Sequence, residues 1–104
     1  MMNTDQGVME VPKVKNVEKK IWDVEGFEIR FMMNGKDVKG HKEGLPQYKY
    51  QNAAKNNMTV EEWRKKRFDS SYPGYQVDVL DVDGVAAPGQ KKLSTVRDSY
   101  IDED

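Results

Sequence analysis

The chain of 104 residues contains no cysteine, one histidine and no apolar run near the roughly 18 residues of a membrane span. Without cysteine there is no disulfide framework, no thiolate zinc site and no cysteine nucleophile. Residues 1–12 lack the charged and apolar pattern of a signal peptide. These absences predict a cytoplasmic protein that does not associate with membranes.

Signatures of catalysis are also missing. His41 has no second histidine or cysteine to complete a site, and Gly40 and Gly44 fit neither a P-loop nor a dinucleotide fingerprint. The acidic run that ends at Asp83-Gly84 is similar to a calcium loop, but an oxygen ligand and a glutamate are missing where Val79 and Gln90 stand. We therefore expect no catalytic residue, metal or cofactor.

What the sequence does have is a modest apolar share, 37%, beside 34% charged residues and ten aromatic residues. Each aromatic ring can bury about 150–250 Å², so a small but ordered core is expected. The length fits one domain. We predict a flexible N-terminal segment over residues 1–12, a single domain over residues 13–101 and an acidic tail over residues 102–104.

The net charge of −1 conceals an uneven distribution along the chain. Residues 13–67 carry a balance of +6, whereas residues 68–104 carry −5. Such asymmetry is typical of a nucleic-acid-binding face, but it also fits two halves that fold against each other with complementary surfaces. The second interpretation is favoured, because many acidic residues are interspersed in the basic half.

Alternation of apolar residues predicts strands in the first half. Phe27, Ile29, Phe31 and Met33 fall on one face at a period of two. Residues 20–24 alternate as well, which predicts an antiparallel hairpin connected at residues 25–26. Asn34-Gly35 predicts a second tight turn, and residues 36–38 a short third strand.

The segment from Thr59 carries the strongest helix signal. Thr59 and Glu62 form a capping box, and Tyr72-Pro73-Gly74 must end the helix, which we expect from about Thr59 to Asp69. Pro46 favours a preceding helix over residues 47–55, although the alternation of Tyr48 and Tyr50 leaves a strand open.

Two further elements complete the predicted fold. Residues 75–82 alternate as a strand that is apolar on both sides at its end, which predicts a central position in the sheet. The spacing of Leu93, Val96, Tyr100 and Ile101 predicts a short amphipathic helix. The fold class is α+β: a small antiparallel sheet of three to four strands packed against one or two amphipathic helices.

The aromatic residues give the leading hypothesis for function. Trp22 and Trp63 are expected in the core by default, but five tyrosines exceed what a small core can hold. We therefore expect a non-enzymatic interaction module, in the style of small bacterial or mobile-element accessory proteins, that binds a protein partner or itself. Its partner-binding residues would be Trp63, Tyr72 and Tyr75.

The cations give the alternative hypothesis. Four consecutive cations, Arg64, Lys65, Lys66 and Arg67, stand on the capped helix near several rings, as a nucleic-acid-binding surface would require, with Lys39, Lys42 and Lys49 as further contacts. Such a run also fits a solvated helix end. A second alternative is a small-molecule binder with a pocket between sheet and helix.

Overall fold

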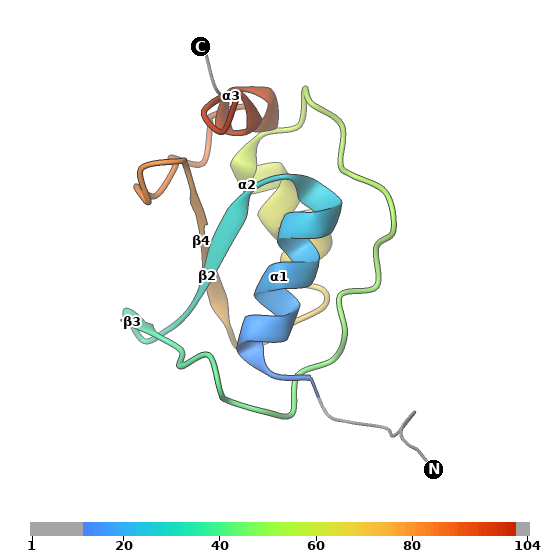
Figure 1. Ribbon diagram of the computed structural model, residues 1–104, viewed down its shortest axis with the longest axis vertical. Helices are drawn as coiled ribbons and strands as arrows, with labels where there is room; N and C mark the ends of the chain where they lie inside the picture. Colours follow the sequence, from blue (N-terminus) through green and yellow to red (C-terminus); the bar gives the residue numbers. More distant parts are fainter. Residues whose placement is uncertain (1–11, 102–104) are drawn as a thin grey trace.

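The computed structural model describes residues 12–101 and has the predicted α+β architecture, a three-stranded antiparallel sheet with helices against one face (Figure 1). Within these residues no helix is long and apolar enough to cross a bilayer. In chain order the elements are α1 (Val14–Glu25), β2 (Glu28–Met33), β3 (Lys36–Asp37), α2 (Val60–Trp63), the π-helical turn η1 (Arg64–Phe68), β4 (Gln76–Leu80) and α3 (Leu93–Asp98).

Helix α1 stands where the alternation of residues 20–24 predicted a strand, so the predicted first hairpin is wrong. The side chains that α1 buries are Val14, Val17, Ile21 and Glu25, spaced by three, four and four residues, which is the helical period. The period-two pattern over residues 20–24 was too short to outweigh it. Gly26 ends the helix in the left-handed conformation, at φ 82°, and donates its N–H to Trp22 O.

Strand β2 is the centre of the sheet, in the order β3-β2-β4. The tight turn at Asn34-Gly35 is confirmed, with both residues at positive φ. The strand predicted over residues 75–82 is shorter and lies at an edge of this sheet instead of its centre. Its register pairs Val77 with Phe31 and Val79 with Ile29, so one face of the sheet is buried and the other faces solvent.

The capping box at α2 is confirmed. Glu62 N donates to Thr59 Oγ1 at 3.1 Å, and Thr59 N donates to Glu62 Oε1 at 2.9 Å. The helix then widens into η1, where Asp69 N donates to Arg64 O five residues earlier. A turn of this width places Trp63 and Phe68, which are five residues apart, on the same buried side with ring centroids 6.1 Å apart.

Residues 39–58, which we call the long segment, form neither the helix nor the strand considered for residues 47–55. The segment runs along the side of α1 that faces away from the sheet (Figure 1). It buries Leu45, Tyr48 and Ala54, which are spaced too irregularly for one face of a helix. Side-chain contacts with the rest of the fold therefore hold its shape.

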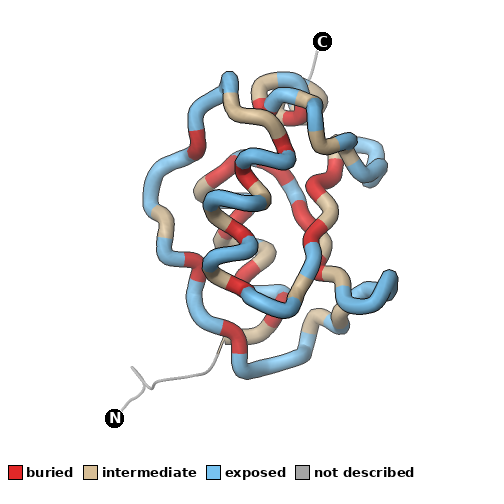
Figure 2. Tube along the Cα trace, turned by 180° about the vertical axis from the view of Figure 1, so that it is seen from behind, coloured by how far each residue is buried: buried red, intermediate tan, exposed pale blue. Residues whose placement is uncertain are grey.

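The core lies between the sheet and the helices, where buried positions of α1, α2, β2 and β4 converge (Figure 2). Four aromatic rings without surface exposure form its centre: Trp63 stacks edge-on against Phe27, and Phe31 contacts Phe68. Trp22 was expected in the core, but it lies on the outer side of α1 and is 38% exposed. Adjacent residues of a helix point in different directions, so Trp22 faces outward where Ile21 faces the core.

Candidate functional site

Glu25 is the one charged residue fully buried in the described part of the chain. Its Oε2 accepts hydrogen bonds from Tyr48 Oη at 2.5 Å and from Arg67 Nη1 at 2.7 Å. Its Oε1 accepts from Ala54 N at 2.9 Å and from Arg97 Nη2 at 3.3 Å. We call these five residues the Glu25 network.

Each arginine of the network also binds the backbone or a polar side chain nearby. Arg97 Nε donates to Glu25 O at 2.6 Å, and its Nη1 donates to Asn56 Oδ1 at 2.7 Å. Arg67 Nη1 donates to Asn52 O at 2.7 Å, and its guanidinium lies 4.3 Å from the centroid of the Tyr50 ring. The hydrogen bonds and ion pairs of the network thus connect the long segment to α1, η1 and α3.

The carboxylate of Glu25 is saturated by these four donors, so it has no free position for a substrate. Burial, followed by the hydrogen bond to Glu25, raises the pKa of the Tyr48 hydroxyl far above its ordinary value. Tyr48 therefore stays a neutral donor to the carboxylate. The arrangement is suited to holding segments together and not to exchanging protons with a ligand.

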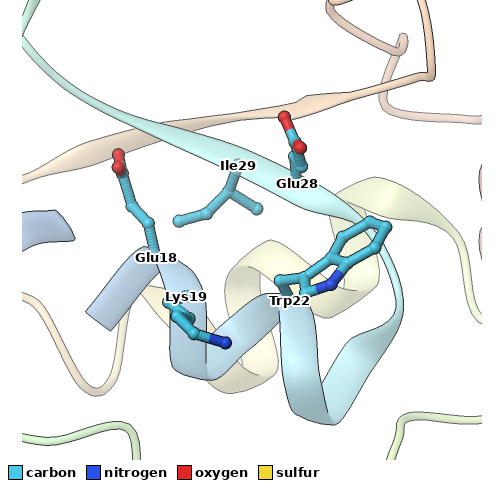
Figure 3. A pocket seen from close by; sticks show the side chains of 5 residues that line it. All are labelled: Glu18, Lys19, Trp22, Glu28 and Ile29. Atoms are coloured by element: carbon cyan, nitrogen blue, oxygen red, sulfur yellow. The ribbon is translucent and has the colours of Figure 1, made fainter. Parts of the chain in front are cut away.

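A groove lies between α1 and β2 on the outside of the molecule, with a cavity of about 290 Å³. We call it the α1–β2 groove, and its lining residues are Glu18, Lys19, Trp22, Glu28 and Ile29. Glu18 and Trp22 are four residues apart on α1 and reach toward β2, with Ile29 between them and Glu28 close to the indole (Figure 3). The indole packs edge-on against Tyr100, with ring centroids 5.1 Å apart.

Charge in the groove is predominantly negative. Glu18 and Glu28 form no ion pair within residues 12–101, whereas Lys19 Nζ lies 3.4 Å from Asp23 Oδ1 and is thereby paired. Glu18 Oε2 accepts a hydrogen bond from Phe31 N at 3.1 Å. Partial burial nevertheless raises the pKa of Glu18, because the carboxylate loses water on the side that faces the strand.

The aromatic residues predicted to bind a partner are placed differently. Trp63 and Tyr72 are inside the core, while Tyr75 is partly exposed with its ring 5.7 Å from Phe31. The exposed ring is that of Trp22. A helical interpretation of residues 14–25 would have found it, since the buried positions Val14, Val17 and Ile21 leave residue 22 on the outer side.

The cations of residues 64–67 point in different directions. Arg67 turns inward to Glu25, Lys65 Nζ pairs with Glu61 Oε2 at 2.9 Å, and Arg64 lines a second cavity beside the sheet. Lys66 remains exposed on η1, near Lys49 through the contact of Tyr50 Oη with Lys66 O. Because residues on a helix fan around its axis, a run of four cations does not make one surface.

Lys39 and Lys42 are brought to the start of α1 instead. Lys42 O accepts from Val14 N at 2.9 Å, and Gly40 O accepts from Lys15 N at 3.0 Å. Lys13 and Lys15 therefore lie beside them. We call these four lysines the basic end; none has an ion-pair partner among residues 12–101.

The acidic residues near the end of β4 are used within the fold. Asp81 Oδ1 accepts hydrogen bonds from Asp83 N and Val85 N, which closes the turn. Asp78 lies 3.9 Å from Arg30 across the strands. In the described range, no group of three or more histidine, cysteine or acidic side chains is placed to hold a metal ion.

Comparison of the chain with protein-family models, with curated proteins and with solved structures found no match.

The first prediction concerns Glu25. We expect Glu25→Gln to lower the free energy of unfolding by about 3 kcal/mol, because Arg67 and Arg97 lose the charge that compensates their burial. Urea denaturation followed by circular dichroism measures the change. Asp23→Asn on the same helix is the matched control: its exposed pair with Lys19 contributes less than about 1 kcal/mol. Equal midpoints for the two variants would contradict a central role for the network.

The second prediction concerns alkaline pH. Burial raises the pKa of Tyr48 and of Tyr72, so both stay protonated when folded at pH values where the unfolded chain ionises, above about 10. The folded state then binds more protons, and stability falls with rising pH by roughly 1.4 kcal/mol per pH unit for each tyrosine.

Two phenylalanine variants separate the contributions. The hydroxyl of Tyr72 has no hydrogen-bond partner among residues 12–101, so Tyr72→Phe should leave stability at pH 7 unchanged or higher and remove part of the alkaline loss. Tyr48→Phe should lower stability at pH 7 by about 1.5–3 kcal/mol, because a hydrogen bond to a charged group is lost. Urea midpoints between pH 8 and pH 11 test both; an unchanged alkaline slope in Tyr72→Phe would show that its hydroxyl is solvated.

Proposed function

We propose that the protein is a non-enzymatic interaction module and that it binds a protein partner at the α1–β2 groove. The observation that carries the proposal is Trp22, a large ring left 38% exposed beside a cavity of about 290 Å³. Tryptophan is enriched among the residues that dominate binding energy at protein interfaces. In this proposal, Trp22 has the partner-binding role that the sequence suggested for Trp63 and Tyr72.

The surroundings of Trp22 support a binding role. Tyr100 packs against the indole edge and is itself fixed, since its Oη donates to Leu80 O and accepts from Glu28 N. Because Tyr100 is fixed, the indole of Trp22 that packs against it loses little conformational freedom when a partner covers it, which favours affinity. The groove borders a regular helix and a central strand, so its walls are positioned before binding.

A peptide library displayed on phage tests the proposal, with the folded protein as bait. We expect the enriched peptides to bind Trp22→Ala at least tenfold more weakly than the wild type, equivalent to about 1.4 kcal/mol. Met33→Ala is the matched control, because Met33 is 39% exposed on the same β2 strand but at its other end. Thermal unfolding of both variants verifies the fold.

The outcomes separate the hypotheses clearly. Enriched peptides that tolerate Trp22→Ala, or the absence of any enrichment, would contradict a partner site at this groove. Dimerisation of the wild type in sedimentation experiments, lost in Trp22→Ala and retained in Met33→Ala, would identify the partner as a second copy. That result would preserve the interaction module.

A second candidate function is nucleic-acid binding at the basic end. It is favoured by the approach of residues 39–42 to the start of α1, which gathers Lys13, Lys15, Lys39 and Lys42. The positive end of the α1 dipole adds to their field. Unpaired lysines of this kind bind phosphates without regard to base sequence.

Fluorescence anisotropy with labelled single- and double-stranded oligonucleotides, titrated at several salt concentrations, tests this candidate. If the basic end binds, Lys39→Glu with Lys42→Glu should reduce the slope of log affinity against log salt by about 2. The pair Lys65→Glu with Lys66→Glu is the control of equal charge change on η1. A slope that responds only to the η1 pair would locate binding there, and no binding at low salt would remove nucleic acid.

A further inference from the structure

We propose that the α1–β2 groove takes an extended peptide segment and binds one lysine or arginine side chain of that segment between Trp22, Glu18 and Glu28. This inference rests on the proposed function and specifies its partner. Three features of the groove favour such an occupant: the open edge of β2, the carboxylates without a paired cation and the indole.

The edge of β2 that faces away from β4 is only partly occupied. Phe31 directs both backbone groups to this side, because its N–H donates to Glu18 and its C=O accepts from Val38 N. Backbone groups alternate along a strand, so those of Ile29 point the same way. Strand β3 pairs only with Met32 and Met33 and does not reach Ile29.

Ile29, which is 5% exposed, therefore directs one donor and one acceptor toward the floor of the groove. The edge of β2 is already hydrogen-bonded to β3 and to the Glu18 carboxylate. An extended segment beside Ile29 would add the next hydrogen-bond partner along this edge. Addition of a peptide to an open sheet edge is a common mode of recognition, in which backbone hydrogen bonds set the register and side-chain pockets give specificity. The groove provides such a pocket directly beside the edge.

The charges of the groove select a cationic side chain. Glu18 extends from α1 toward β2 and Glu28 stands on β2; both line the cavity, and neither has a paired cation in the described part of the chain (Figure 3). The nearest cations are engaged elsewhere: Lys19 with Asp23, and Arg30 with Asp37 at 3.5 Å. A bound ammonium or guanidinium group would be attracted by both carboxylates.

The indole of Trp22 provides the third contact. A lysine or arginine stem can pack along Ile29 and the ring, while its charged end reaches the carboxylates; tryptophan is the ring that attracts cations most strongly. An acidic or purely apolar side chain would leave Glu18 and Glu28 uncompensated. The chain's own residues 1–11 carry two acidic residues and no cation, so their charge does not match this site.

Synthetic peptides provide the test. Four nine-residue peptides, identical in a threonine- and serine-rich host sequence, would carry lysine, arginine, norleucine or glutamate at the central position. We expect the lysine and arginine peptides to bind the wild type at least tenfold more tightly than the norleucine peptide, measured by fluorescence anisotropy. Substituting both Glu18→Gln and Glu28→Gln should reduce this advantage to less than threefold.

Glutamine at position 18 keeps an acceptor for Phe31 N, so the fold is preserved in that variant. The control substitutes Glu43→Gln and Glu61→Gln, two exposed carboxylates outside the groove, and should retain the full advantage. N-methylation, scanned along the lysine peptide, should abolish binding at alternate positions only, since the other amides of a strand point away from Ile29.

The outcomes distinguish this inference from the proposed function. Peptides that bind in a Trp22-dependent way without preferring lysine or arginine would overturn the cationic occupant and leave the interaction module intact. A lysine preference insensitive to every N-methyl group would overturn the extended backbone. If no peptide of the series or of the displayed library depends on Trp22, both proposals fail.

Discussion

The fold depends on one buried carboxylate. Glu25 joins two arginines, a tyrosine and a backbone amide that come from positions 48, 54, 67 and 97, so a single side chain connects α1 to the long segment, η1 and α3. Burying a charge is costly, and a buried ion pair often contributes little net stability compared with apolar packing. The buried ion pairs instead favour one arrangement of the segments over others, because an alternative arrangement would leave a charge uncompensated inside the protein. The irregular path of the long segment is explained in this way.

The same geometry separates the parts that hold the molecule together from the parts that remain free to bind. Arg67, Trp63 and Tyr72 were attractive as binding residues in the sequence, yet the first neutralises Glu25 and the other two fill the core. Trp22 and Glu28 have no comparable structural task, and Glu18 contributes one hydrogen bond, which it accepts from Phe31 N. The groove that they form is built on a helix and a strand, whose positions the core already fixes.

Local signals in the sequence predicted the elements whose chemistry is complete within a few residues. Thr59 and Glu62, Asn34-Gly35 and the alternation of residues 27–33 each formed as expected, and the α+β class followed from them. Residues 20–24 were misassigned because a three-residue alternation fits a helix equally well. The Glu25 network had no local signal, since its members are up to 72 residues apart and a glutamate at the end of a helix usually faces solvent. The exposure of Trp22 depended on assigning that helix correctly.

Arg97 follows the other members of the Glu25 network in the sequence, which has a consequence for synthesis on the ribosome. Chain growth presents Glu25, the long segment and η1 long before Arg97 emerges, and Arg97 binds both the carboxylate of Glu25 and its carbonyl oxygen. Until then the carboxylate has only part of its compensation, and Asn56 lacks the guanidinium that it binds. The Glu25 network is therefore complete only after Arg97 has left the exit tunnel, and a chain truncated before α3 would lack the contacts of Arg97 with Glu25 and with Asn56 of the long segment.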